Sequence, residues 1–458
     1  MSLQAQPSSE RIHIAFFGVR NAGKSSIVNA VTGQDLSLVS DVAGTTTDPV
    51  QKAMELLPLG PVVIIDTPGI DDVGALGEQR VERTRNVLRR AEIAVLVVSA
   101  ETGLQEADRE LIRLFQERKL PYLVVLNKID LIGCNSYASQ MEFDALGIAS
   151  GLEGDRGRFS VSRLGENSKE GSENGLMFPG GQETENRPLS PVRQEQDSAE
   201  ADTPFAVLEA SAVTGAGIHE LKEALGRLAP KAKKQRPLVA DLVERGDFVI
   251  LVTPIDASAP KGRMILPQQM MIRGLLDAGA IPVVCREFEY ADTLAQLGKV
   301  PRMVITDSQV FEKIDRETPE EIPLTSFSIM MARFKGTLTG AVSGARFLKE
   351  LQDGDAVLIS EGCTHHRQCE DIGTVKMPNW IRNYTGKNVE FRFTSGGTFP
   401  TDFSDIKMIV HCGGCMLNEK EMQSRAAEAQ AAGVPMTNYG IAIAQMHGIL
   451  DRSIELFD

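Results

Sequence analysis

A short segment near the N-terminus constrains the fold of this chain more than any other feature. Residues 18–25 read Gly-Val-Arg-Asn-Ala-Gly-Lys-Ser; they follow the apolar run Ile12–Phe17 and lead into a helical pattern over Lys24–Val31. Such a loop binds phosphate through its backbone N–H groups and the N-terminus of the helix, so it needs a buried strand before it and a helix after it. The segment therefore predicts a doubly wound α/β domain with a parallel sheet.

Further buried strands are expected along the first half of the chain. The apolar runs that predict them lie at Val62–Ile65, Ile93–Val98, Tyr122–Leu126 and Phe205–Leu208. We assign residues 1–236 to this P-loop domain. It includes an insertion at about 140–203, where Gly, Ser, Glu, Asn and Gln dominate, and a segment of this composition is expected to be disordered because it cannot bury a core.

The nucleotide is predicted by motifs that follow the loop in a fixed order. Residues 127–130 read Asn-Lys-Ile-Asp, and the Asp130 carboxylate can accept two hydrogen bonds from guanine, a donor pair that adenine lacks. Residues 66–69 read Asp-Thr-Pro-Gly, and residues 211–212 read Ser-Ala, which matches the last motif of GTPases. We expect GTP to contact Gly18, Asn21, Ala22, Gly23, Lys24, Ser25, Ser26, Asp66, Thr67, Pro68, Gly69, Asn127, Lys128, Asp130, Ser211 and Ala212.

Magnesium is expected beside the phosphates of the nucleotide. A hydroxyl at Ser25 and a carboxylate at Asp66 are oxygen ligands of the kind that Mg²⁺ prefers. A threonine from the segment between these motifs must also reach the metal, and we choose Thr46, with Thr45 or Thr47 as the alternatives. The sequence therefore predicts GTP and Mg²⁺ as ligands of one site.

Hydrolysis of GTP is expected to depend on Lys24, Thr46 and Gly69, which would surround the γ-phosphate. Ile70 stands where Ras-like proteins carry a water-positioning Gln, so unassisted hydrolysis should be slow and need K⁺, dimerisation or a partner. The form Gly-x-x-Asn-x-Gly-Lys-Ser resembles the K⁺-responsive members of the TrmE–Era family of GTPases. This resemblance implies that Asn21 helps to hold K⁺ beside the phosphates.

The composition argues against several classes of protein. A net charge of −14 disfavours a nucleic-acid binder, which displays a basic surface. We expect no membrane-spanning helix and no secretory signal, because long apolar runs are missing. Six cysteines are too few for a disulfide scaffold in a chain of 458 residues, and four of them lie between Cys363 and Cys415. This clustering favours metal or redox chemistry in a reducing cytoplasm.

Two smaller α/β domains are expected after the GTPase domain, over residues 237–324 and 325–458. The first contains strand-like runs such as Phe248–Val252 but no motif that marks chemistry, so we interpret it as a spacer or an assembly surface. Cys285 lies in an apolar strand of this domain and is expected to be buried.

Cysteines and histidines gather after two predicted strands of the last domain. Residues 363–365 read Cys-Thr-His, and residues 411–415 read His-Cys-Gly-Gly-Cys. Because ligands collect at the carboxyl ends of parallel strands, we expect Cys363, Cys412 and Cys415 to face one metal centre. Thiolates suit zinc or an iron–sulfur cluster, and three sulfurs with a replaceable fourth ligand favour the cluster.

The spacing Cys-x-His, then 45 residues, then His-Cys-x-x-Cys resembles the HydF-type maturation GTPases of [FeFe]-hydrogenases. The resemblance covers the whole chain, as a GTPase domain, a dimerisation domain and a cluster domain. It implies a [4Fe–4S] cluster on Cys363, Cys412 and Cys415, with the fourth position open or held by an exchangeable group such as His365 or His411.

The same resemblance implies a homodimer that receives a diiron precursor from two radical-SAM maturases and delivers it to the apo-hydrogenase. GTP turnover would then control the association of these partners. Two other functions stay open at this point: a ribosome- or tRNA-modification-associated GTPase with a structural zinc, and a redox enzyme that uses the cluster. The first of these predicts zinc, and the second predicts turnover of a small molecule.

Overall fold

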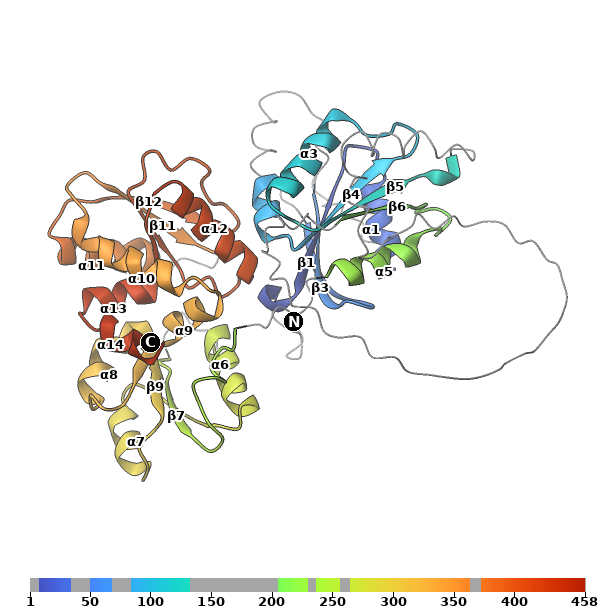
Figure 1. Cartoon of the computed structure of the whole chain (residues 1–458). Helices are drawn as coiled ribbons and strands as arrows, with labels where there is room; N and C mark the ends of the chain where they lie inside the picture. Colours follow the sequence, from blue (N-terminus) through green and yellow to red (C-terminus); the bar gives the residue numbers. More distant parts are fainter. Residues whose placement is uncertain are drawn as a thin grey trace, which may run out of the picture.

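The computed structural model describes residues 8–33, 50–67, 84–131, 205–229, 236–255, 264–362 and 372–457. Within these ranges the strands form one six-stranded sheet and two four-stranded sheets, with helices packed against them (Figure 1). The predicted fold class is confirmed: a P-loop domain with a mainly parallel sheet is followed by further α/β units. No helix in these ranges has both the length and the apolar character needed to cross a membrane.

The first sheet has the strand order β2-β3-β1-β4-β5-β6. Its strands are β1 (Ile12–Phe17), β2 (Val50–Leu56), β3 (Gly60–Asp66), β4 (Ile93–Ser99), β5 (Tyr122–Asn127) and β6 (Phe205–Glu209). Its helices are α1 (Lys24–Thr32), α3 (Glu106–Glu117), α5 (Ile218–Leu228) and a helical segment over 84–90. Every residue of β4 is buried, because apolar cores cover both faces of the sheet.

One edge of this sheet departs from the predicted parallel arrangement. β2 runs antiparallel to β3, with Val50 opposite Asp66 and Leu56 opposite Gly60. Only residues 57–59 connect the two strands. A connection this short can join antiparallel neighbours, whereas parallel strands need a crossover of a dozen or more residues.

The second sheet is parallel, with the order β10-β9-β7-β8. Its strands are β7 (Phe248–Val252), β8 (Ile281–Cys285), β9 (Met303–Thr306) and β10 (Leu324–Ser326), and its helices are α6 (Leu266–Asp277), α7 (Tyr290–Gln296), α8 (Phe311–Glu317) and α9 (Phe327–Phe334). The predicted domain boundary between residues 324 and 325 falls inside β10. Cys285 is only partly buried, contrary to expectation, because β8 is an edge strand.

The third sheet is parallel, with the order β12-β11-β13-β14. Its strands are β11 (Ala356–Glu361), β12 (Glu390–Ser395), β13 (Met408–His411) and β14 (Met436–Asn438). The helices around it are α10 (Leu338–Arg346), α11 (Met377–Thr385), α12 (Glu419–Ala431) and α13 (Tyr439–Met446). The last helix, α14 (Leu450–Ile454), packs instead against β10 of the second sheet. Ser360 of β11 lies opposite His411 of β13, so the carboxyl ends of these two strands are neighbours.

Candidate functional site

The phosphate-binding loop joins β1 to α1 with backbone angles that few residues adopt. Gly23 has φ of 84°, and a Cβ there would lie 2.2 Å from Asn127 Nδ2, so only glycine fits. Asn21 also has a positive φ, 64°, which asparagine tolerates better than most residues. The loop therefore has the strand-to-helix setting that phosphate binding requires.

Asn127 connects three of the predicted nucleotide motifs. Its buried Nδ2 donates to the backbone oxygen of Ala22 over 3.0 Å, and its Oδ1 accepts from the backbone nitrogen of Ala212 over 3.2 Å. Next to it, Lys128 forms an ion pair with Glu101 at 3.2 Å. The phosphate loop, the base-reading motif and the last motif are therefore held together at one end of the sheet.

Asp66 lies at the end of β3 beside the phosphate loop. Lys24 Nζ is 3.6 Å from its Oδ1, and Ser25 Oγ donates to its Oδ2 over 3.4 Å. Burial raises the pKa of the Asp66 carboxyl, and Lys24 and Ser25 oppose this rise. Its buried Oδ1 accepts no hydrogen bond. A carboxylate oxygen without a donor, next to a serine hydroxyl, suits the oxygen-ligand chemistry of Mg²⁺.

Not every predicted residue of the nucleotide site points at the nucleotide. The hydroxyl of Thr67 donates to Phe16 O over 2.7 Å, so this side chain is held by the sheet. Asp130 lies in the short helical turn Ile129–Leu131, after β5. Three predicted residues, Thr46, Pro68 and Gly69, lie outside the described residues, as do Cys363 and His365 of the predicted cluster site.

Cys412 lies where β11 and β13 end side by side. Its Sγ accepts backbone hydrogen bonds from Gly362 N over 3.0 Å and from Gly414 N over 3.4 Å, and its own N–H donates to Ser360 O over 2.8 Å. Burial raises the pKa of the Cys412 thiol, and the two N–H donors oppose this rise. Backbone N–H groups directed at a sulfur are what a thiolate ligand of an iron–sulfur cluster uses.

The described chain stops at Gly362, one residue before Cys363. Within the described ranges, no group of three or more His, Cys, Asp or Glu side chains forms a metal site. Of the predicted ligands, these ranges contain Cys412, Cys415 and His411, and both of these thiols are free. Gly362, at the end of β11, lies beside the Cys412 sulfur.

His411 has both ring nitrogens engaged by protein groups. Nδ1 lies 2.7 Å from the carbonyl oxygen of Cys412, which can only accept, so Nδ1 carries the proton. Nε2 then accepts a hydrogen bond from Arg425 Nη1 over 3.0 Å. Burial, and then the Arg425 charge, lower the pKa of His411 to about 3. In this arrangement His411 has no free lone pair for a metal, which disfavours it as the fourth ligand relative to His365.

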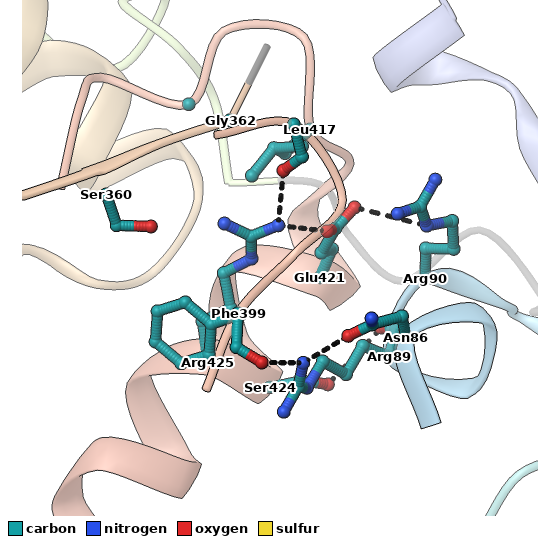
Figure 2. A network of polar contacts seen from close by, with 12 residues as sticks. Asn86, Arg89, Arg90, Ser360, Gly362, Phe399, Leu417, Glu421, Ser424 and Arg425 are labelled. Carbon is teal, nitrogen blue, oxygen red and sulfur yellow. Dashed lines mark hydrogen bonds and ion pairs between the residues drawn. The ribbon is translucent and has the colours of Figure 1, made fainter. Parts of the chain in front are cut away.

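A polar network connects the C-terminal domain, which contains Cys412, to the GTPase domain (Figure 2). Glu421 lies between two guanidinium groups: it accepts from Arg425 Nη2 over 2.6 Å and lies 3.7 Å from Arg90 Nε. Arg89, almost fully buried, donates to Phe399 O over 2.9 Å and pairs with Glu428 at 2.7 Å. Arg89 and Arg90 belong to the 84–90 helix, so the contact involves the segment that follows the Asp66 motif along the chain.

Sequence reasoning missed this network and one buried cation. Lys335, after α9, donates to Gly414 O and, over 2.8 Å, to Leu417 O, within the loop that carries Cys415. No local motif marks these residues. The spacing of Glu421 and Arg425, four residues apart on α12, was the one available signal.

Comparison with known families assigns most of the described chain. Residues 339–456 match the hydrogen maturase F tetramerization domain, residues 238–336 match the hydrogen maturase F dimerization domain, and residues 13–128 match the 50S ribosome-binding GTPase family. The second match ends after α9, so it includes β10. A GTPase domain of this kind implies binding of GTP and Mg²⁺.

Individual relatives match a smaller part of this chain. The tRNA modification GTPase MnmE of Dechloromonas aromatica is 37% identical over 124 residues, which are 26% of this chain and 27% of that protein. GTPase Der of Kosmotoga olearia is 32% identical over 137 residues, 29% of this chain and 31% of Der. The chain therefore spans less than a third of these curated relatives. Among solved structures, an Era variant of Aquifex aeolicus bound to GDP.AlF4- aligns with a TM-score of 0.32 and 17% identity, over 62% of this chain and 98% of Era.

Proposed function

The chain belongs, by its domain composition, to the HydF-type GTPase maturases, and from this premise we propose that it is a GTP-hydrolysing scaffold for the diiron subcluster of [FeFe]-hydrogenase. It would receive the diiron precursor from radical-SAM maturases and deliver it to the apo-hydrogenase in the cytoplasm. The observation that carries the proposal is the Cys412 thiol, with its two backbone N–H donors, at the junction of two strand ends in a chain that also has a GTPase domain.

At the nucleotide site we propose that Lys24 contacts the β- and γ-phosphates, while Ser25, Thr46 and Asp66 hold Mg²⁺. The Oδ1 of Asp66, which accepts no hydrogen bond and lies 3.6 Å from Lys24 Nζ, and the nearby Ser25 hydroxyl support the metal assignment. The Gly69 amide would contact the γ-phosphate. Asn21, which is exposed and has a left-handed backbone, is the residue that we propose helps to hold a K⁺ ion that stimulates hydrolysis.

At the cluster site we propose that Cys363, Cys412 and Cys415 bind a [4Fe–4S] cluster, with His365 as the exchangeable fourth ligand. The N–H groups of Gly362 and Gly414 support a thiolate at Cys412. When bound, the cluster would supply an iron that exchanges its outer ligand, the chemistry needed to hold a transferable diiron unit.

A homodimer is supported by the edge of the second sheet. β8 has no neighbour on its outer side among the described strands. Its Ile281 and Val284 side chains are 43% and 44% exposed, and Phe288 beyond its end is 69% exposed. An apolar edge strand with free backbone groups is suited to pair with a second copy.

We further propose that GTP acts on the cluster domain through the 84–90 helix. The support is the continuous set of contacts from Arg90 to Glu421, from Glu421 to Arg425 and from Arg425 to His411, next to Cys412. Loops after Asp66 change with the γ-phosphate in GTPases, and such a change would reach the cluster loop through these contacts.

The first test is anaerobic purification with iron, sulfide and zinc analysis and an EPR spectrum of the reduced protein. We expect iron and sulfide in wild type and in Cys285→Ser, and their loss in Cys412→Ser. Zinc without sulfide would instead favour a structural site, and the scaffold role would be rejected.

The coupling is tested by hydrogen–deuterium exchange of residues 410–425 with GDP and with a non-hydrolysable GTP analogue. We expect a nucleotide-dependent difference in wild type that Arg90→Gln removes. Arg118→Gln is the matched control, because Arg118 contacts Glu428 at 3.4 Å but lies at the end of α3, outside the 84–90 helix. If wild type shows no difference between the two nucleotides, the coupling proposal is wrong.

A further inference from the structure

Lys335 is a buried cation that the nucleotide site does not use. It follows α9 and is only 3% exposed. Its Nζ donates to the carbonyl oxygens of Gly414 and Leu417, which flank Cys415. Its own carbonyl accepts from Gln423 Nε2 of α12 over 3.2 Å, so the ammonium is bonded to the cysteine loop and the backbone to the helix that follows this loop.

The ammonium of Lys335 has no carboxylate partner among the residues that the structure describes, since its bonds go to neutral carbonyl groups. A buried charge is costly unless it is paired, so a protein rarely keeps one without a counter-charge. Burial lowers the pKa of Lys335 to about 8, and the groups that most oppose this are the thiols of Cys415 and Cys412. Glu421 and Glu419 of α12 act in the same direction, but the hydrogen bonds of the ammonium are to the cysteine loop.

We propose that Lys335 is a positioning and charge-balancing residue of the cluster site: its hydrogen bonds hold the Gly414–Leu417 loop so that the cysteines converge, and its ammonium balances the negative charge of a thiolate-bound cluster. This inference rests on the proposed function. Since Lys335 lies in the segment that matches the dimerization domain and Cys415 in the segment that matches the tetramerization domain, the cluster site is completed by both segments.

A nearby positive charge favours the reduced, more negative state of a cluster, so its removal should lower the reduction potential. The test is redox titration of the cluster, followed by EPR, in the full-length protein. Lys335→Gln keeps a hydrogen-bond donor but removes the charge, and Lys335→Arg keeps the charge. Lys349→Gln is the matched control, because Lys349 is an exposed lysine on the turn Phe347–Glu350, in the segment that also contains Cys415.

We expect Lys335→Gln to change the ratio of reduced to oxidised cluster at least tenfold at a fixed potential, a shift of about 59 mV to more negative values for one electron. Lys335→Arg and Lys349→Gln should stay near the wild-type potential. If Lys335→Gln takes up no iron while Lys335→Arg does, the need for the charge is supported in a second way.

Two results would overturn the proposal for Lys335 alone. One is a wild-type potential in Lys335→Gln. The other is loss of iron from both Lys335 variants, although their metal-free forms have the same melting temperature as the metal-free wild-type protein. If the wild-type protein itself contains no iron and sulfide, the proposed function fails, and the role of Lys335 fails with it. The wild-type metal analysis therefore separates the two failures.

Discussion

Glu421 offers a sharp test of the contact between the GTPase domain and the C-terminal domain. Its side chain is 3% exposed and lies between Arg425, which is fully buried, and Arg90. The change Glu421→Gln keeps the shape of the side chain but removes the charge that both guanidinium groups face. Breaking a buried ion pair from one side costs about 3–5 kcal/mol, because the remaining charge is left unpaired.

This cost sets the size of the expected effect on melting. For a unit of 150–250 residues, each 1 kcal/mol shifts the melting temperature by about 2–4 °C, so Glu421→Gln should lower it by about 6–20 °C. The single tryptophan of the chain, Trp380, lies on α11 of the cluster domain, so its fluorescence reports on that domain alone. Thermal unfolding of the metal-free protein, followed by Trp380 fluorescence, is the assay.

The control is Glu419→Gln, the same chemical change on the same helix. Glu419 is 42% exposed and pairs with Arg236 at 3.5 Å, and an exposed pair contributes about 0–1 kcal/mol. If Glu421→Gln melts within the range of this control, the network does not hold the domain as argued, and the coupling proposal loses its physical basis.

Four further predictions follow from the two sites. Lys24→Ala should slow GTP hydrolysis about 10²–10³-fold, measured as phosphate release, while the iron content stays unchanged; loss of iron would contradict separate sites. Asn127→Ala should weaken GTP binding at least tenfold by calorimetry, because Ala22 O and Ala212 N lose their partner. His411→Gln should keep the iron and sulfide of wild type, and their loss would show that His411 is a ligand after all. Because burial and Arg425 lower the pKa of His411 to about 3, the unfolded chain binds more protons between pH 6.5 and 3. The metal-free domain should therefore lose about 1.4 kcal/mol of stability per pH unit as the pH falls through this window, a slope that His411→Gln removes.

The parts of the fold that were predictable are those with local causes. β1, β4, β5 and α1 follow from unbroken apolar runs and from the phosphate loop, whose glycine is imposed by the approach of Asn127 to Gly23. The antiparallel edge strand β2 was not predicted, because its sequence has no unbroken apolar run. Its direction is set by the short connection to β3. The partial exposure of Cys285 depends on β8 being an edge strand, which strand order decides.

The predicted cluster ligands show the same division. The apolar run before Cys412 predicted that this residue lies at the end of a strand. In the structure Cys412 follows β13, and its sulfur accepts a hydrogen bond from Gly362 N. The alternative ligand His411 was chosen for its closeness in sequence to Cys412, but its ring nitrogens are engaged by Cys412 O and by Arg425 on α12. A residue's free lone pairs depend on its neighbours in space, which spacing along the chain does not reveal.

The fold class, the GTP motifs and the cysteine pattern that marks the family can be read from the amino-acid sequence, because each is encoded in residues close together or in a periodic apolar pattern. The charges that face the loop of Cys412 and Cys415, and the contacts that this part of the chain makes with the GTPase domain, follow from packing and could not be predicted. Lys335 contacts Gly414 and Arg89 contacts Phe399, pairs separated by 79 and 310 positions. The physical reason is that the cost of burying a charge is set by the groups around it in space, and these come from several sheets and helices at once.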